Sequence, residues 1–203
     1  MEEQTVFIVD DNAAVRDSIQ ELVESVGLRA ETYPSAKAFL NAFQPERSGC
    51  LVLDVRMAGM SGLALQEKLK ELGARIPVII ITGHGDVPMA VHAMKTGAAD
   101  FVQKPYRDQL LLDSINNALA VDAAARRSSA RKDNLDQHLA VLTEREREVL
   151  DQVLTGCSSK QIARELDISH RTVESHRLNV LRKLKVASVK ELIGLLVVPD
   201  NDE

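Results

Sequence analysis

Two adjacent acidic residues follow a short apolar segment near the start of the chain. In "TVFIVDDN", Asp10 and Asp11 come directly after a run that is typical of a strand buried on both faces. Neighbouring carboxylates repel each other, so their position needs a reason. Either they belong to a helix N-cap, where Asp and Asn are favoured, or they hold a cation. These residues alone leave both explanations open.

Three further residues with suitable chemistry follow later strand-like segments. Asp54 ends "CLVLD", Thr82 ends "PVIIIT", and Lys104 follows "DFVQ". Converging carboxylates favour a hard cation such as Mg²⁺, which is held by one or two carboxylates and several waters. One carboxylate could then attack phosphorus and form an acyl phosphate. The Lys104 ammonium would help to neutralise the phosphoryl oxygens, and the Thr82 hydroxyl could bond to one of them.

The elements that must position these residues alternate along the first 119 residues. Strands are expected at "VFIV", "LRAETY", "CLVLD", "PVIIIT" and "DFVQK", and helices at residues 13–26, 35–43, 61–72, 86–96 and 108–119. This order predicts an α/β fold, a doubly wound, flavodoxin-like parallel sheet of five strands. Functional groups of such sheets gather at the carboxyl ends of the strands, where all the residues above fall.

The rest of the chain is expected to be helical, which divides it into residues 1–120, a helical linker at 121–140 and an all-α domain at 141–199. The linker has no Gly or Pro and is expected to be a solvated helix, with an interruption near Ser128 and Ser129 left open. In the last domain, Thr143 and Glu146 form a capping-box pattern and Gly156 ends that helix. A short helix in "SSKQIAREL", a longer one in "ISHRTVESHRLNVLRKL" and a last one in "SVKELIGLLVV" follow.

The charge of this helical end is opposite to that of the whole chain. The chain has a formal net charge of −5, but residues 157–190 carry eight Lys and Arg against three acidic residues, a net of +5. A solvated helix face would mix both signs along its length, whereas concentrated basic charge is typical of binding to a phosphate backbone. A short helix, a turn and a longer helix predict a helix-turn-helix whose second helix enters the major groove of DNA.

Residues for the two kinds of DNA contact can be proposed on these helices. Base edges are expected to meet groove-facing residues of the longer helix, since Arg donates to guanine and Glu accepts from cytosine. Phosphates are the expected partners of hydroxyl, imidazole and basic side chains nearby. The base candidates are Arg171, Glu174, Ser175 and Leu178, and the phosphate candidates are Ser159, Lys160, Thr172, His176, Arg177 and Lys183.

Composition narrows the class of protein. No uninterrupted apolar run reaches the roughly 18 residues of a membrane span, and the acidic start "MEEQ" does not resemble a signal peptide. The two cysteines, Cys50 and Cys157, lie far apart, which favours a reduced protein. A cytoplasmic protein without membrane contact is therefore expected.

At this point two known families match the motifs. "VDDN", "LDVRMAGMSG" and "ITGHGDVPMAVHAMKTGAADFVQKPY" resemble the receiver domain of two-component response regulators, most closely the FixJ-like subgroup, over about residues 5–120. "LTEREREVL" and "SSKQIARELDISHRTVESHRLNVLRKL" resemble the DNA-binding domain of the LuxR/NarL class over about residues 142–198. Together they imply a transcription factor and not an enzyme, apart from its own Mg²⁺-dependent phosphorylation and dephosphorylation.

The receiver resemblance assigns roles to individual residues. It implies that Asp54 accepts phosphate from a cognate sensor histidine kinase. Mg²⁺ (or Mn²⁺) would be bound directly by Asp11 and Asp54, through water by Asp10, and by the backbone carbonyl of Arg56. The other implied features are a switch pair of Thr82 and Phe101, a cis peptide bond at Lys104-Pro105, and a dimer face that includes Val91 and Lys95.

The resemblance also implies partners: a second copy of the chain once it is phosphorylated, double-stranded DNA and RNA polymerase. One departure from the family pattern is visible. The loop after Asp54 commonly reads Met-Pro-Gly but here contains Ala58, so we expect a looser loop in the absence of metal. Arg56 and His84 are candidates for tuning the lifetime of the phosphoryl group, although a solvent-facing role is preferred for His84.

Three alternative functions make different demands on the sequence. A phosphohydrolase working through an aspartyl phosphate would need a second acid/base carboxylate near Asp54, but "DVRMAG" places Arg56 there. A flavodoxin-like cofactor protein would need a Gly- or hydroxyl-rich loop after the first strand, which "DDNAAVRDS" does not resemble. A receiver whose helical end binds a protein partner is the third.

Overall fold

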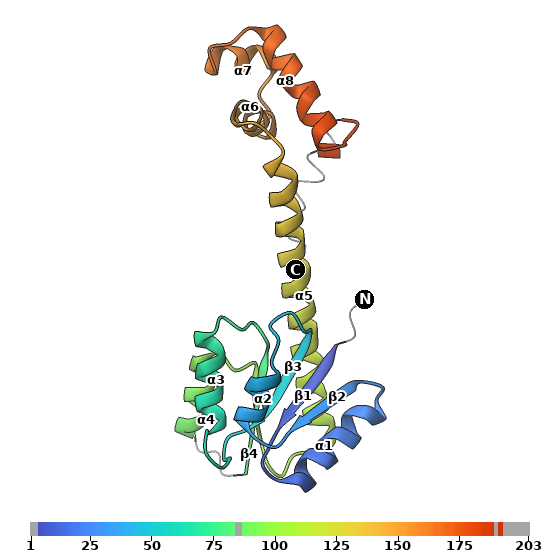
Figure 1. Ribbon diagram of the computed structural model, residues 1–203, viewed down its shortest axis with the longest axis vertical. Helices are drawn as coiled ribbons and strands as arrows, with labels where there is room; N and C mark the ends of the chain where they lie inside the picture. The colour runs from blue at the N-terminus through green and yellow to red at the C-terminus, as the bar shows by residue number, and fades with distance from the viewer. Residues whose placement is uncertain (1–3, 84–86, 189–190, 193–203) are drawn as a thin grey trace. The chain divides into compact units, whose positions relative to one another are not determined.

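The N-terminal part of the chain is built on one parallel sheet. The computed structural model describes residues 4–83, 87–188 and 191–192. The strands are β1 (Thr5–Val9), β2 (Arg29–Tyr33), β3 (Gly49–Asp54), β4 (Val78–Thr82) and β5 (Asp100–Gln103). They pair in the order β2-β1-β3-β4-β5, and all four pairings are parallel (Figure 1). The predicted sheet is confirmed, and each observed strand begins and ends within one residue of its predicted segment.

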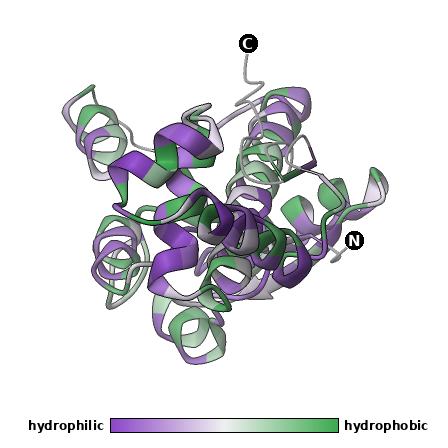
Figure 2. Cartoon of the chain, turned by 90° about the horizontal axis from the view of Figure 1, so that it is seen from above, coloured by the Kyte–Doolittle hydropathy of each residue, from purple (hydrophilic) through white to green (hydrophobic). Residues whose placement is uncertain are grey.

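Helices cover both faces of this sheet, because β1, β3 and β4 carry apolar side chains on both sides. Phe7, Leu51 and Ile80 face a core closed by α2 (Ala36–Ala42), α3 (Gly62–Glu71) and α4 (Val87–Thr96). The opposite face packs against α1 (Ala13–Ser25) and the first turns of α5 (Asp108–Ala140). Figure 2 shows hydrophobic and hydrophilic residues alternating along the helices, as helices covering a core require.

Helix α5 includes the predicted helical linker. It runs for 33 residues to Ala140, and the interruption near Ser128 and Ser129 that the sequence left open does not occur. The expectation that this helix is solvated is wrong at one position, because Asp122 is only 2% exposed. The chain divides into two compact units, residues 1–127 and 128–203, so the division falls inside the predicted linker. Each unit is described by itself below.

The C-terminal unit contains α6 (Glu144–Leu154), α7 (Ser159–Glu165) and α8 (His170–Lys183). The capping box of Thr143 and Glu146 is confirmed, and Gly156 follows α6 with a φ of 84°. Two small apolar clusters hold the helices together, one around Leu150 and Val180 and the other around Ile162 and Val173. Most of the predicted last helix lies outside the described residues. Residues 191–192, which belong to it, are described and are helical.

Neither described cysteine forms a disulfide, as expected, and Cys50 is fully buried in β3. Among the helices of the described part of the chain, none has the length and apolar character needed to cross a bilayer.

Candidate functional site

One lysine ties together the carboxylates of two neighbouring strands. Asp10 follows β1 and Asp54 ends β3, and these strands pair directly. Lys104, which follows β5, places its Nζ 2.7 Å from Asp10 Oδ2 and 2.8 Å from Asp54 Oδ1. Both acids are nearly buried, with 1% and 6% exposure. The predicted convergence at the carboxyl edge of the sheet is present for these three residues.

Burial changes the proton affinities of this group. It raises the pKa of Asp54 above its usual range, although the hydrogen bond and charge of Lys104 act in the opposite direction. Burial works to lower the pKa of Lys104, but its bonds to Asp10 and Asp54 outweigh burial and raise that pKa. A raised pKa keeps Lys104 positively charged at this site near neutral pH.

The loop after β3 brings Asp11 to the same edge. The amide of Arg56 donates to Asp54 Oδ2 at 2.7 Å, and the amide of Ala58 donates to Asp11 Oδ2 at 2.9 Å. A Cβ on Gly62 would lie 2.1 Å from the Asp54 carbonyl oxygen, so only glycine lets α3 start this close to the strand end. A loose loop is expected from Ala58, whereas the hydrogen bond from its amide to Asp11 restrains the loop.

The donor set at this edge suits a hard cation. Among the described residues, no three His, Cys, Asp or Glu side chains form a ready-made metal site. Mg²⁺ needs fewer, because one or two carboxylates and several waters suffice. Asp11 follows β1 and Asp54 ends β3, but each accepts an amide from the loop of residues 56–58, which also carries the Arg56 carbonyl. The residues present therefore fit Mg²⁺.

Helix capping, the alternative role considered for Asp10 and Asp11, is performed by the next residue, Asn12. Asn12 is the N-cap of α1, and its side chain accepts from Ala14 N at 3.0 Å. Asp10 Oδ1 accepts from the Asn12 amide at 2.8 Å, which fixes the turn before the helix. Arg16, which the sequence analysis did not single out, donates through Nη1 to the Asp10 carbonyl oxygen at 2.7 Å. Because Asn12 caps the helix, Asp11 is not needed as the cap and can serve as a metal ligand at the carboxyl edge of the sheet.

The other receiver-like residues lie on β4, β5 and α4. Thr82 is buried at the end of β4, and Phe101 is partly buried on β5 against the core cluster that faces α4. The Lys104-Pro105 peptide bond is cis, as expected. Val91 and Lys95 are both exposed on α4, Val91 at 45%. His84 lies outside the described residues.

The predicted base-reading residues share one exposed face of α8. Arg171, Glu174, Ser175 and Leu178 are spaced at i, i+3, i+4 and i+7, and all four are exposed. Leu178 is 67% exposed, whereas the other face of this helix is buried at Val173 and Val180. Within the described residues, the exposed face lacks the packing that a core role would require.

The predicted phosphate contacts differ in their surroundings. Lys160 is exposed at the start of α7, whereas Arg177 Nη1 donates to Ser159 Oγ at 2.8 Å and so links α8 to α7. Thr172 lies in the first turn of α8, where its amide donates to the N-cap Ser169 at 3.0 Å. His176 is half-buried, and its Nδ1 makes no hydrogen bond within the described part of the chain.

Lys183 has a structural partner. Its Nζ lies 2.6 Å from Glu146 Oε2, and the Glu146 carboxylate also accepts from the Thr143 amide at 2.8 Å. Burial acts to raise the pKa of Glu146, but the bonds from Lys183 and Thr143 outweigh it and lower that pKa below its usual range. The ion pair connects α6 to α8, so the role of Lys183 toward DNA stays a prediction.

Comparison with known families agrees with both halves of the chain. Residues 6–116 match the family described as "Response regulator receiver domain", and residues 140–196 match "Bacterial regulatory proteins, luxR family". The chain is similar to the response regulator protein TodT of Pseudomonas putida, with 48% identity over 93% of this chain and 83% of TodT. It is also similar to the transcriptional regulatory protein FixJ of Rhizobium meliloti, with 46% identity over 96% of both chains.

Solved structures give the same picture. The structure of the response regulator StyR matches 96% of this chain and 98% of its own, with a TM-score of 0.85 and 45% identity. Full-length FixJ from B. japonicum matches 96% of both chains, with a TM-score of 0.59 and 41% identity. The FixJ-like resemblance seen in the sequence is therefore confirmed.

Proposed function

Because the chain belongs to the two-component response regulators that join a receiver domain to a LuxR-family DNA-binding domain, we propose that phosphorylation of Asp54 controls its binding to DNA. The single observation that carries this proposal is the bridge from Lys104 to both Asp10 and Asp54. It supports Asp54 as a nucleophile, because a fixed ammonium group beside a nearly buried carboxylate can stabilise the incoming phosphoryl oxygens.

The proposed reaction is transfer of a phosphoryl group from a phosphohistidine of a sensor kinase. An oxygen of Asp54 forms the new P–O bond while the P–N bond breaks, and the departing imidazole takes up a proton. Asp11, Asp54 and the Arg56 carbonyl would hold Mg²⁺ (or Mn²⁺) directly and Asp10 would hold it through water, and the ion would supply further neutralisation of the phosphoryl charge. Lys104 holds a phosphoryl oxygen, and the Thr82 hydroxyl turns to bond to another.

We propose that phosphorylation favours a second conformation of the receiver, and that this conformation promotes DNA binding. Movement of Thr82 and inward rotation of Phe101 change the surface of α4 and β5, on which Val91 and Lys95 are exposed. We propose that this surface forms a homodimer, which presents two α8 helices to two half-sites of double-stranded DNA about one helical turn apart. The protein then acts in the cytoplasm on transcription by RNA polymerase.

The test uses the full chain with Mg²⁺ and acetyl phosphate. Phosphorylation is measured by intact mass, and DNA binding by gel shift on a duplex selected from a random pool with the phosphorylated protein. We expect an added mass of one phosphoryl group and tighter DNA binding, both absent in Asp54→Asn. Phosphorylation of Asp54→Asn at the wild-type level would overturn the assignment of the nucleophile.

A partner-binding role for the helical end is the competing function. It would give normal phosphorylation but no duplex selected from the pool. The exposed face made of Arg171, Glu174, Ser175 and Leu178 argues for DNA, because two of its side chains can bond to base edges.

A further inference from the structure

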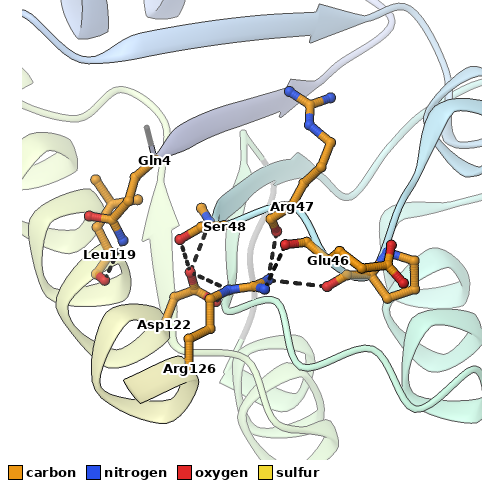
Figure 3. A network of polar contacts seen from close by, with 9 residues as sticks. Gln4, Glu46, Arg47, Ser48, Leu119, Asp122 and Arg126 are labelled. Carbon is orange, nitrogen blue, oxygen red and sulfur yellow. Dashed lines mark hydrogen bonds and ion pairs between the residues drawn. The ribbon is translucent and has the colours of Figure 1, made fainter. Parts of the chain in front are cut away.

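Helix α5 remains attached to the N-terminal unit beyond the point where its apolar packing ends. The last buried apolar residues of this packing are Ala118 and Leu119. Three residues later, the Asp122 carboxylate is 2% exposed, and its Oδ2 accepts from Ser48 Oγ at 2.6 Å and from the Gly49 amide at 2.9 Å (Figure 3). A helix that was only a solvated linker would have no reason to bury this charge.

Arg126, one turn further along, completes the arrangement. Its Nε lies 2.9 Å from Asp122 Oδ1 and 3.0 Å from Oδ2. Its two terminal nitrogens donate to three backbone carbonyl oxygens in the segment before β3, at 2.6–3.2 Å; these belong to Pro45, Glu46 and Arg47 (Figure 3). Asp122, Arg126, Ser48 and Gly49, with these carbonyls, are called the α5 clamp below.

The α5 clamp requires particular residue types at Asp122, Arg126 and Gly49. A buried carboxylate is tolerated only when it is paired and fully hydrogen-bonded, which the hydroxyl, amide and guanidinium donors achieve here. The planar guanidinium can face a carboxylate with one edge and carbonyls with the other, which a lysine ammonium cannot do. Gly49 is also required, because its φ is +153° and a Cβ there would lie 1.8 Å from the Thr5 carbonyl oxygen.

The clamp holds the opposite edge of the sheet from the acidic site. Ser48 and Gly49 lie at the amino end of β3, and Asp54 lies at its carboxyl end. Gln4, just before β1, donates through Nε2 to the Leu119 carbonyl oxygen at 2.8 Å (Figure 3). The two strands that lead to Asp10 and Asp54 are thus both tied, at their other ends, to the same stretch of α5.

From this geometry we infer that the α5 clamp makes residues 120–126 a rigid part of the receiver, so that the receiver's state passes into α5 without a hinge near residue 120. The second half of this inference rests on the proposed function. The first half concerns only contacts within residues 1–127, which form one compact unit. Elements that move together can carry a conformational signal, and the clamp supplies such a connection between β3 and α5.

The chain offers a matched pair of variants. Arg126→Ala removes the clamp guanidinium, whereas Arg127→Ala removes the same charge from the exposed neighbouring position. Hydrogen exchange of peptides that cover residues 48–54 and 120–127 reports the clamp itself. The ratio of DNA affinities with and without acetyl phosphate, on the selected duplex, reports transmission. Arg126→Lys keeps the positive charge but lacks the planar guanidinium. It serves as the milder variant if Arg126→Ala folds poorly.

We expect Arg126→Ala to speed exchange in both peptides at least tenfold and to reduce the phosphorylation-dependent affinity ratio at least threefold, with normal phosphorylation of Asp54. Arg126→Lys should give smaller changes in the same direction, and Arg127→Ala should give none. Unchanged exchange in Arg126→Ala would overturn the clamp. Faster exchange with an unchanged affinity ratio would overturn transmission through it. A wild-type chain that shows no response to acetyl phosphate would instead contradict the proposed function, while the exchange data would still decide the clamp.

Discussion

The backbone amide of Ala58 donates a hydrogen bond to the carboxylate of Asp11, 2.9 Å away and 47 positions earlier in the chain. A proline at this position, the residue expected from the family pattern, has no N–H and could not make this bond. The bond orients a proposed metal ligand from the loop that carries another, the Arg56 carbonyl. Ala58 therefore replaces some backbone stiffness with a direct contact.

Replacing Ala58 separates these two effects. Ala58→Pro removes the amide donor and stiffens the loop, whereas Ala58→Gly keeps the donor and loosens it. If the bond orients Asp11, Ala58→Pro should weaken Mg²⁺ binding about threefold to tenfold, since a net hydrogen bond contributes about 1 kcal/mol, and Ala58→Gly should bind like wild type. Amide chemical shifts followed during a Mg²⁺ titration measure both affinities. Tighter binding by the proline variant and weaker binding by the glycine variant would mean that stiffness matters more.

Lys104→Gln tests the charge balance at the acidic edge. It leaves two nearly buried carboxylates without their shared cation, so we expect the free energy of unfolding at pH 7 without Mg²⁺ to fall by about 3 kcal/mol. Burial raises the pKa of Asp54, and the hydrogen bond and charge of Lys104 partly offset this rise. Loss of Lys104 should therefore raise the pKa of Asp54 further. The folded variant then binds protons more readily than its unfolded chain, and the stability deficit should shrink as pH falls toward 5. Urea unfolding at both pH values decides this, and a deficit that grows in acid would contradict it.

The Glu146–Lys183 ion pair gives the C-terminal unit a different pH dependence. The pKa of Glu146 is lowered on folding, so its contribution to stability is present above its unfolded value of about 4.5 and is lost as pH falls through the folded pKa. Glu146→Gln should lower the free energy of unfolding at pH 7 by roughly 1–3 kcal/mol and remove part of the acid dependence below pH 4.5. Thermal unfolding followed by circular dichroism from pH 7 to 3 measures this. Equal acid sensitivity of variant and wild type would count against the ion pair.

Two lysines proposed to contact phosphates should behave differently, because within the described residues only Lys183 has an internal partner. Lys160→Ala should leave the thermal midpoint unchanged, weaken DNA binding on all sequences and reduce the slope of log affinity against log salt by about one. Lys183→Ala should lower the thermal midpoint of the C-terminal unit, since it leaves the nearly buried Glu146 unpaired. Fluorescence anisotropy at several salt concentrations, together with calorimetry, distinguishes the two. A loss of salt slope in Lys183→Ala without a loss of stability would make that lysine a DNA contact instead.

Local patterns in the sequence were enough to predict the sheet. Apolar runs between turn signals located all five strands, and the capping-box pattern of Thr143 and Glu146 marked the start of α6. The chain order of Asp10, Asp54 and Lys104 predicted their convergence, because parallel strands bring their carboxyl ends to one edge. These features depend on neighbours in sequence or on topology that follows from it.

Contacts between distant side chains could not be predicted in the same way. The bonds of Asp122 to Ser48 and Gly49 span 74 and 73 positions, and nothing near Asp122 distinguishes it from an exposed helix residue. Similarly, the basic charge of Lys183 suggested DNA, but the carboxylate that it meets lies 37 positions earlier. Only the folded arrangement shows which charges are already paired.

The position of β3 in the middle of the sheet has a consequence during synthesis. This strand pairs with β1 on one side and β4 on the other, and Lys104 reaches Asp54 only after β5 has joined β4. A nascent chain therefore cannot assemble the proposed phosphoryl acceptor until β5 has left the ribosome. Formation of this site thus coincides with completion of the N-terminal sheet, so we expect no phosphorylation of shorter nascent chains.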